Sequence, residues 1–143
     1  MAKKPLTRSQ LVKKLDRVFK KYIRYSRSYV VNGVHYAVCV TCQKEVPTRK
    51  IHAGHYIRCG VMTTRWNEFN VAPQCIGCNT YNFGEPTLYR MYIVKTYGES
   101  VAEQLDKALV DWKRGKARPI PIQWLRDKLE EYEAKLKELN VPK

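Results

Sequence analysis

The feature that most constrains this chain is a pair of Cys-x-x-Cys motifs, Cys39 to Cys42 and Cys75 to Cys78. The second motif begins 33 positions after Cys42, and two such pairs are typical of a structural zinc site in which each pair forms one knuckle. We therefore predict that four thiolates bind one Zn²⁺ and that loss of any one unfolds the centre of the fold. Redox dithiols are the competing interpretation. The fifth cysteine, Cys59, is expected to be a free thiol.

The net charge of the chain indicates the class of its binding partner. The chain has 143 residues, with 27 Lys and Arg against 13 Asp and Glu, so its net charge is +14 at pH 7. Such a surface attracts polyanions, and DNA is the first partner to consider, with a merely basic protein as the alternative. Because there is no apolar run of roughly 18 to 20 residues and no apolar leader, we expect a cytoplasmic protein without membrane contact. A reducing compartment would keep the cysteines free for metal.

The N-terminal part, residues 1–28, is predicted to be a basic amphipathic helix. Apolar residues recur at helical spacing from Thr7 onward, and Thr7 with Gln10 fits a capping box. On so basic a chain, the charged face of this helix favours phosphate contact over simple solvation. An Asn-Gly dipeptide then predicts a β-hairpin across residues 29–38.

The centre of the chain, residues 29–84, is predicted to be the zinc-stapled core. We expect a short strand over residues 50–57, a loop over 58–73 and a helix over 76–83. The loop contains Arg65-Trp66-Asn67, which combines charge, an aromatic face and an amide and so suits nucleic acid. A tryptophan packed beneath the loop is an equal alternative.

The remaining residues, 85–143, are predicted to be helical. Helical patterns run over residues 86–97, from an N-cap at Ser100 to Gly115, and over 122–139. The last pattern has the four-and-three spacing of a coiled-coil seam, through Leu125, Leu129, Tyr132, Leu136 and Leu139. This seam could pack on its own domain or join two copies. We expect a homodimer, through helix 122–139 or through the Tyr-rich helix that begins at Pro86.

Hydrolysis of a phosphodiester needs a base whose pKa lies near the working pH and a hard cation that stabilises the transition state. His55 can be the base, since imidazole titrates near ~6.5. Asn79 directly follows the last cysteine and opens a helix, so its amide oxygen could bind Mg²⁺ or Mn²⁺ from a rigid position. Side chains alternate across a strand, so His52 and His55 are expected to point apart.

Several short motifs together resemble a known family. Cys-x-x-Cys, a strand histidine and Cys-x-x-Cys-Asn resemble the zinc-stapled HNH, or ββα-metal, endonucleases, in an order similar to that of phage endonuclease VII. A closer resemblance is to the phage lambda NinG (Rap) recombination endonucleases. It is carried by Tyr22-Ile-Arg24, Ala53-Gly-His-Tyr56, Arg65-Trp-Asn67, Gln74-Cys-x-x-Cys-Asn79 and Tyr97-Gly98.

The resemblance implies an α+β fold and a metal-dependent endonuclease that cuts branched DNA, such as Holliday junctions and D-loops, during recombination. It implies that His55 is the general base and Asn79 a ligand of a catalytic Mg²⁺ or Mn²⁺. Asn70 would match the middle Asn that orients the base, and Asn82 is the fallback ligand. A phage protein in the host cytoplasm or nucleoid is also implied. Our candidates for DNA contact are Lys13, Lys20, Arg24, Arg58, Arg65 and Arg90.

The chain departs from the HNH pattern at Gly54, where many of these enzymes have an acidic metal ligand. His52 is on the same strand face, one step back, and we infer that it supplies the missing ligand. Neutral imidazole binds Mn²⁺ better than Mg²⁺, so activity should then favour Mn²⁺.

Two rival functions remain open from the sequence. One is a non-enzymatic zinc module that binds nucleic acid through its N-terminal helix. The other is an HNH nicking endonuclease without branch preference. Cleavage of branched and linear DNA by the same preparation separates all three.

Overall fold

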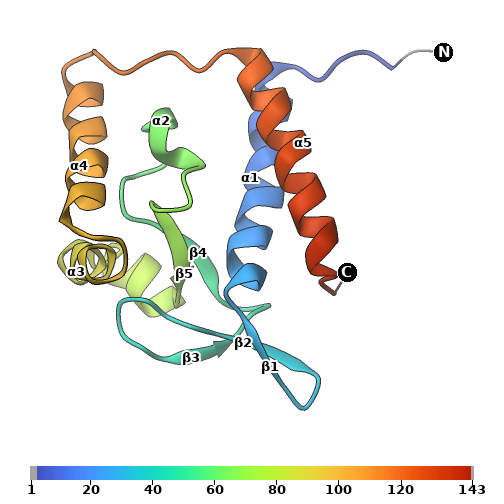
Figure 1. Ribbon diagram of the computed structural model, residues 1–143, viewed down its shortest axis with the longest axis vertical. Helices are drawn as coiled ribbons and strands as arrows, with labels where there is room; N and C mark the ends of the chain where they lie inside the picture. The colour runs from blue at the N-terminus through green and yellow to red at the C-terminus, as the bar shows by residue number, and fades with distance from the viewer. Residues whose placement is uncertain (1–2, 143) are drawn as a thin grey trace.

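The computed structural model describes residues 3–142 and is a small α+β structure with two sheets and helices on both sides of the central one. Its elements, in chain order, are α1 (Arg8–Ser26), β1 (Tyr29–Val31), β2 (Val34–Val38), β3 (Glu45–Pro47), β4 (His52–His55), α2 (Met62–Arg65), β5 (Val71–Gln74), η1 (Gly77–Tyr81), α3 (Pro86–Tyr97), α4 (Glu99–Lys113) and α5 (Ile122–Leu139). In Figure 1 the β4–β5 ribbon lies between the α1–α5 pair and the α3–α4 pair.

The α1–α5 pair is built from amphipathic helices. Thr7 and Gln10 form the predicted capping box at the start of α1. One face of α1 buries apolar side chains against α5, and the two helices run in the same direction because a linker returns the chain across the top of the molecule (Figure 1). The buried members of this first apolar cluster include Leu11, Leu15, Phe19, Ile23, Leu125, Leu129 and Tyr132.

The sequence left open whether the α5 seam packs within the chain or joins two copies. The structure uses it within the chain, since Leu125 is fully buried and Leu129 and Tyr132 nearly so. Only the end of the seam, at Leu139, is exposed. A dimer would therefore have to use another surface.

The predicted hairpin is present as β1–β2, and Asn32 and Gly33 both have the positive φ of its turn. β3 extends it to a three-stranded antiparallel sheet. Our prediction of a loop over residues 58–73 was wrong, because this segment contains α2 and most of β5. All four residues of β5 are buried, so the strand shows no alternation of apolar and polar residues, and Pro73 disguised it further.

β5 pairs antiparallel with β4 in a second, two-stranded sheet, in which His52 lies opposite Gln74 and His55 opposite Val71. Ala53 and Val71 face the first apolar cluster. Ala72 faces a second cluster, which contains Ile57, Val61, Tyr89, Ile93, Ala102 and Leu105. The ribbon is thus covered on both faces.

Two further expectations need correction. The short helix after the second cysteine pair, η1, is a π-helix, and Phe83, Gly84 and Glu85 follow it with positive φ. α4 begins at Glu99 with Gly98 as its N-cap, so Ser100 lies inside the first turn and not at the cap.

Trp66 is buried and its Nε1 donates to Asp16 at 2.9 Å, so of the two alternatives for this residue the structure shows packing in the core. No helix within residues 3–142 is long and apolar enough to cross a membrane.

Candidate metal centre and nuclease site

The fold brings the four paired cysteines together as predicted. Their Sγ atoms all lie within 4.8 Å of one another, and Cys42 Sγ is 3.7 Å from Cys75 Sγ. A tetrahedron with Zn–S bonds of about 2.3 Å has edges of roughly 3.8 Å, so this spacing fits one zinc ion. The third apolar cluster consists of Cys39, Cys75 and Cys78 with Val46 packed beside them. Apolar contacts alone are few here, and a metal would supply most of the cohesion.

The thiols differ in their tendency to ionise. Burial raises the pKa of Cys39, but hydrogen bonds from Thr41 and from backbone amides outweigh it and lower this pKa to about 6. Burial raises the pKa of Cys78 to about 12, and neighbouring thiols add to the effect. Four thiolates in so small a volume repel one another unless a cation lies among them. The donor set therefore suits a divalent ion that prefers sulfur.

Two further side chains that could bind a metal meet beside the cysteine cluster. Asn79, on η1, places its amide nitrogen 3.0 Å from Nδ1 of His52, at the start of β4. An amide can be turned so that its oxygen occupies this position, because O and N are assigned from contacts alone. Two ligands of an octahedral ion with bonds of about 2.1 Å lie roughly 3.0 Å apart. The 3.0 Å contact is a hydrogen bond between the two side chains, and two neighbouring ligands of one ion would lie about the same distance apart.

This second pair lacks an acidic partner. Within residues 3–142, the cysteines form the only group of three or more His, Cys, Asp or Glu side chains that could hold a metal. The sequence proposed both residues as ligands of one catalytic metal, and the structure places their side chains in contact. The alternative ligand, Asn82, is exposed at the end of η1, where its backbone N–H donates to Gly77 O at 2.9 Å. Asn79, not Asn82, is the asparagine that meets His52.

His55 lies on the other face of β4, as alternation predicted. Its Nε2 is 2.9 Å from the backbone oxygen of Arg65 on α2. Because a carbonyl only accepts, Nε2 must carry the proton and Nδ1 is left with its lone pair. Burial lowers the pKa of His55 below 6.5, and the carbonyl of Arg65 opposes this only in part. The imidazole is therefore neutral at pH 7, as a base must be.

Asn70 organises the loop between β4 and β5. Its buried side chain accepts from Ile57 N at 2.7 Å and donates to Ile57 O and Thr64 O, both at 3.0 Å. These bonds close the segment that carries Arg65, whose carbonyl contacts His55. Asn70 thus holds the loop whose Arg65 carbonyl contacts His55.

Gln74 is a residue that sequence reasoning missed. It is fully buried, and its Nε2 donates to Gly84 O at 2.8 Å and to Thr41 Oγ1 at 3.2 Å. Its Oε1 lies over Gly54, where any added Cβ would overlap it. Position 54 therefore cannot carry an acid while Gln74 holds this place. The sequence signal was a polar residue directly before Cys75, at the end of an apolar run.

The six candidate DNA contacts differ in how free their charges are. Arg65 forms an ion pair with Asp16, with Nη2 to Oδ2 at 2.6 Å, and Arg90 pairs with both Glu99 and Asp106. Arg24 donates to Thr48 O at 3.2 Å, and Arg58 lies over the ring of Trp112. Lys13 and Lys20, on α1, have no ion pair within the described range. Of the six, these two lysines are the most available to phosphate.

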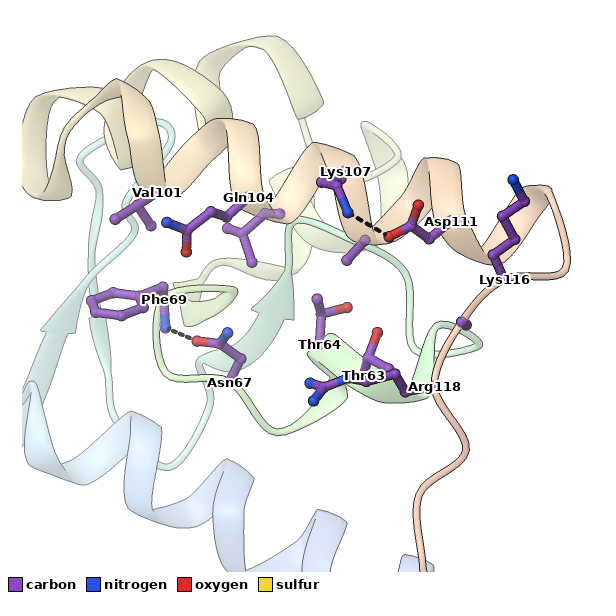
Figure 2. A pocket seen from close by; sticks show the side chains of 13 residues that line it. Thr63, Thr64, Asn67, Phe69, Val101, Gln104, Lys107, Asp111, Lys116 and Arg118 are labelled. Atoms are coloured by element: carbon purple, nitrogen blue, oxygen red, sulfur yellow. Dashed lines mark hydrogen bonds and ion pairs between the residues drawn. The ribbon is translucent and has the colours of Figure 1, made fainter.

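The protein also has a pocket of about 450 Å³ away from these histidines, between α4 and the α2 segment (Figure 2). Phe69, Asn67 and Gln104 line one end, and Lys116 and Arg118 lie at the other. None of the predicted catalytic, metal-ligating or DNA-contact residues lines it, although Asn67 of the Arg65-Trp66-Asn67 segment does. The candidate site is instead the ribbon of β4 with its neighbours η1 and α2.

Comparison with known proteins gives one match. A family model described as Bacteriophage Lambda NinG protein matches residues 2–141. No curated protein and no solved structure matches the chain.

Proposed function

The chain belongs to the bacteriophage lambda NinG family, and from this membership and the site geometry we propose that it is a metal-dependent endonuclease that hydrolyses phosphodiesters in branched DNA. In this proposal β4, β5 and η1 are the core of a ββα-metal nuclease, and the four cysteines hold a structural zinc. The observation that carries the proposal is the 3.0 Å contact between His52, on β4, and Asn79, on the helix that follows the second cysteine pair. His55, three positions after His52, has its ring oriented by the carbonyl of Arg65.

His52 and Asn79 would hold the catalytic cation, with water completing its coordination. A divalent cation at this place neutralises charge on the phosphate and on the leaving oxygen. Asn79 is well suited to the role because its own backbone N–H donates to Cys75 O at 2.9 Å, which ties it to the zinc centre. The ligand is thus positioned before DNA arrives.

His55 would take the proton from the attacking water at Nδ1. Its other nitrogen is occupied by Arg65 O, so the ring cannot turn away without breaking that bond. His52 and His55 lie on opposite faces of a strand that is paired along one edge only. A phosphate at the unpaired edge of β4 would be reached by His55 from one face and by the His52–Asn79 pair from the other.

The basic charge of α1 supports DNA as the substrate. α1 turns a basic face away from its buried stripe, including Lys13, Lys14, Arg17, Lys20 and Lys21. Phosphate contact by such a face is independent of sequence and depends steeply on salt. Preference for a branch would then come from where the phosphates lie, and family membership favours branched DNA over plain duplex.

Cleavage of a labelled four-way junction and of a matched linear duplex, in Mg²⁺ and in Mn²⁺, tests the proposal. We expect wild type to cut the junction faster than the linear duplex. His55→Ala should cut about 10² to 10⁴-fold more slowly than wild type while it binds the junction normally. His52→Ala and Asn79→Ala should lose rate and require more metal. The matched control is His35→Ala, because His35 contacts Ser28 and Tyr25 and lies outside the site.

An active His55→Ala protein with normal binding would refute the assignment of the base. Equal Mg²⁺ activity in His52→Ala would refute its role as a ligand. Equal rates on junction and duplex would favour the nicking alternative.

The second candidate is a non-enzymatic zinc module that binds DNA, and the basic face of α1 favours it independently. It predicts tight, salt-sensitive binding, with about 0.9 log unit of affinity per log unit of salt for each phosphate contact, and no metal-stimulated scission.

A further inference from the structure

Two aromatic side chains beside the candidate site are the most exposed of the large apolar residues within residues 3–142. Tyr81 is 72 % exposed and Phe83 is 90 % exposed. They follow Asn79 on η1 and on the turn after it, and the residues between Thr80 and Phe83 are all exposed. A single exposed apolar residue needs no explanation, but two such aromatic rings beside a candidate metal ligand do.

The segment that carries these rings is held at both ends. It begins at the cysteine cluster, and at its far end Gly84 N donates to Cys78 O at 2.8 Å. The buried amide of Gln74 donates to Gly84 O at 2.8 Å, and Gly54 leaves the space for that amide. The rings therefore project from a fixed frame. Holding them in place costs little conformational entropy when they contact a ligand.

The backbone at Phe83 is strained. Its φ is +54°, a left-handed conformation that is uncommon for a bulky residue. Such strain persists where surrounding contacts hold it, and it is often found at functional sites. Here the contacts at Gly84 hold it, and the result is a phenylalanine that points into solvent.

The chain is strongly basic, with a net charge of +14, which suits a nucleic-acid partner. Residues 75–84 contain no charged side chain, and Glu85 follows them. Arg49 and Lys50, just before His52, are exposed and have no ion pair in the part of the chain that the structure describes. Polar Thr80 and Asn82 alternate with the rings, so the patch is not the continuous apolar face that a protein partner would cover.

We propose that Tyr81 and Phe83 form an aromatic wedge that enters a base step at a DNA branch point and unstacks it, while Arg49 and Lys50 contact the flanking phosphates. Apolar wedges enter DNA at base steps that are easily unstacked, and stacking is disrupted more easily at a branch point than within a continuous duplex. The inference rests on the proposed function, and it names the feature of the substrate that the site would recognise. Plain duplex lacks this feature and should gain little from the wedge.

The test uses a four-way junction with 2-aminopurine at the branch, in Ca²⁺ so that binding is measured without relying on cleavage. Wild type should raise the 2-aminopurine fluorescence on binding, because the reporter base leaves its stack. The Tyr81→Ala/Phe83→Ala double variant should lose most of this rise and bind the junction at least roughly tenfold more weakly, with affinity for linear duplex unchanged. Met91→Ala is the matched control, since Met91 is also an exposed apolar side chain, at 62 %, but lies on α3.

An unchanged fluorescence rise in the double variant would overturn the wedge, and so would an equal loss of affinity for junction and duplex. A third contrary result is a double variant whose oligomeric state changes in light scattering while its fluorescence rise and its affinity for the junction stay at those of wild type. Circular dichroism and zinc content show that the variant is folded. If wild type shows the fluorescence rise but does not cut in Mg²⁺ or Mn²⁺, the proposed endonuclease fails and the wedge stands. If wild type cuts junctions and the double variant is unchanged in fluorescence and affinity, the wedge fails and the endonuclease stands.

Discussion

The α1–α5 pair and the cysteine centre are held together by different physics. The helix pair buries a continuous set of large apolar side chains, among them Leu15, Phe19 and Leu125, each with no measurable exposure. The cysteine centre has three buried cysteines and little apolar packing beyond the partly buried Val46. One region is stabilised by removal of apolar surface from water, and the other contains a thiol cluster that a structural metal could hold together.

The difference matters because the candidate chemistry lies where the two regions meet. β4 contacts α1 through Ala53 on one face, while His52 on the other face contacts Asn79 beside the cysteines. We therefore expect the α1–α5 pair to remain folded when the cysteine centre is altered. Four changes test this separation, in order of expected effect.

Removal of zinc should have the largest effect. Chelation, or Cys75→Ala, should remove stabilisation on the order of 10 kcal/mol from the centre of the fold, because binding of a structural zinc is coupled to folding. The α1–α5 pair should keep much of its helicity. Hydrogen exchange measured by NMR distinguishes the regions, and uniform loss of protection in both would show that they are one cooperative unit.

Truncation in the helix pair should act on the other region. Leu125→Ala should lower the free energy of unfolding by about 2 to 5 kcal/mol, because it leaves a cavity between α5 and α1. Urea denaturation measures this, and zinc content should stay at that of wild type. Leu139→Ala on the exposed end of α5 is the control and should stay within about 0.5 kcal/mol of wild type.

Gly54→Ala should disturb the link between the regions. The added Cβ would overlap Gln74 Oε1, so the amide must move and its bond to Gly84 O is weakened. We expect a loss of about 1 to 3 kcal/mol in thermal or urea unfolding. Gly60→Ala is a matched control, since a Cβ there would meet nothing closer than Trp112 at 3.9 Å. If both glycine variants are equally stable, Gln74 does not hold the turn.

Titration of His55 should have the smallest effect. Burial lowers its folded pKa below the ordinary 6.5, so the unfolded chain binds more protons between the two values. Stability from this residue is therefore complete above pH 6.5 and is lost as pH falls through the lower, folded pKa. Unfolding in urea at pH 7.5 and at pH 5.5 should show a drop in wild type that is smaller in His55→Gln. His35→Gln is the control, and an equal reduction there would contradict the assignment.

Most of what the sequence predicted correctly rests on local patterns. The capping box of Thr7 and Gln10, the Asn-Gly turn and the long amphipathic helices each depend on residues within a few positions of one another. The cysteine cluster was also predicted, although its two pairs lie far apart in the chain. Each pair is a short Cys-x-x-Cys motif, and two such motifs are typical of one metal site.

The candidate site was predicted in part. Strand parity placed His52 and His55 on opposite faces, and the structure agrees. His52 was proposed as a metal ligand because position 54 has no acid, and in the structure its ring contacts Asn79. Sequence reasoning could not find β5, because a fully buried strand has no alternation to detect. It also could not find the Arg65–Asp16 ion pair, whose members are 49 positions apart. Arg65 was therefore assigned to DNA although its charge is already paired.

By itself, then, the sequence determined the basic amphipathic α1, the cluster of four cysteines and the strand faces of the two histidines, since each follows from spacing along the chain. Only the tertiary structure decided that the α5 seam packs on α1, that Gln74 fills the space over Gly54, and that Tyr81 and Phe83 project beside Asn79. These outcomes depend on which surfaces bury each other and which backbone groups find partners. Packing sets both across the whole chain, and no short window of residues contains that information.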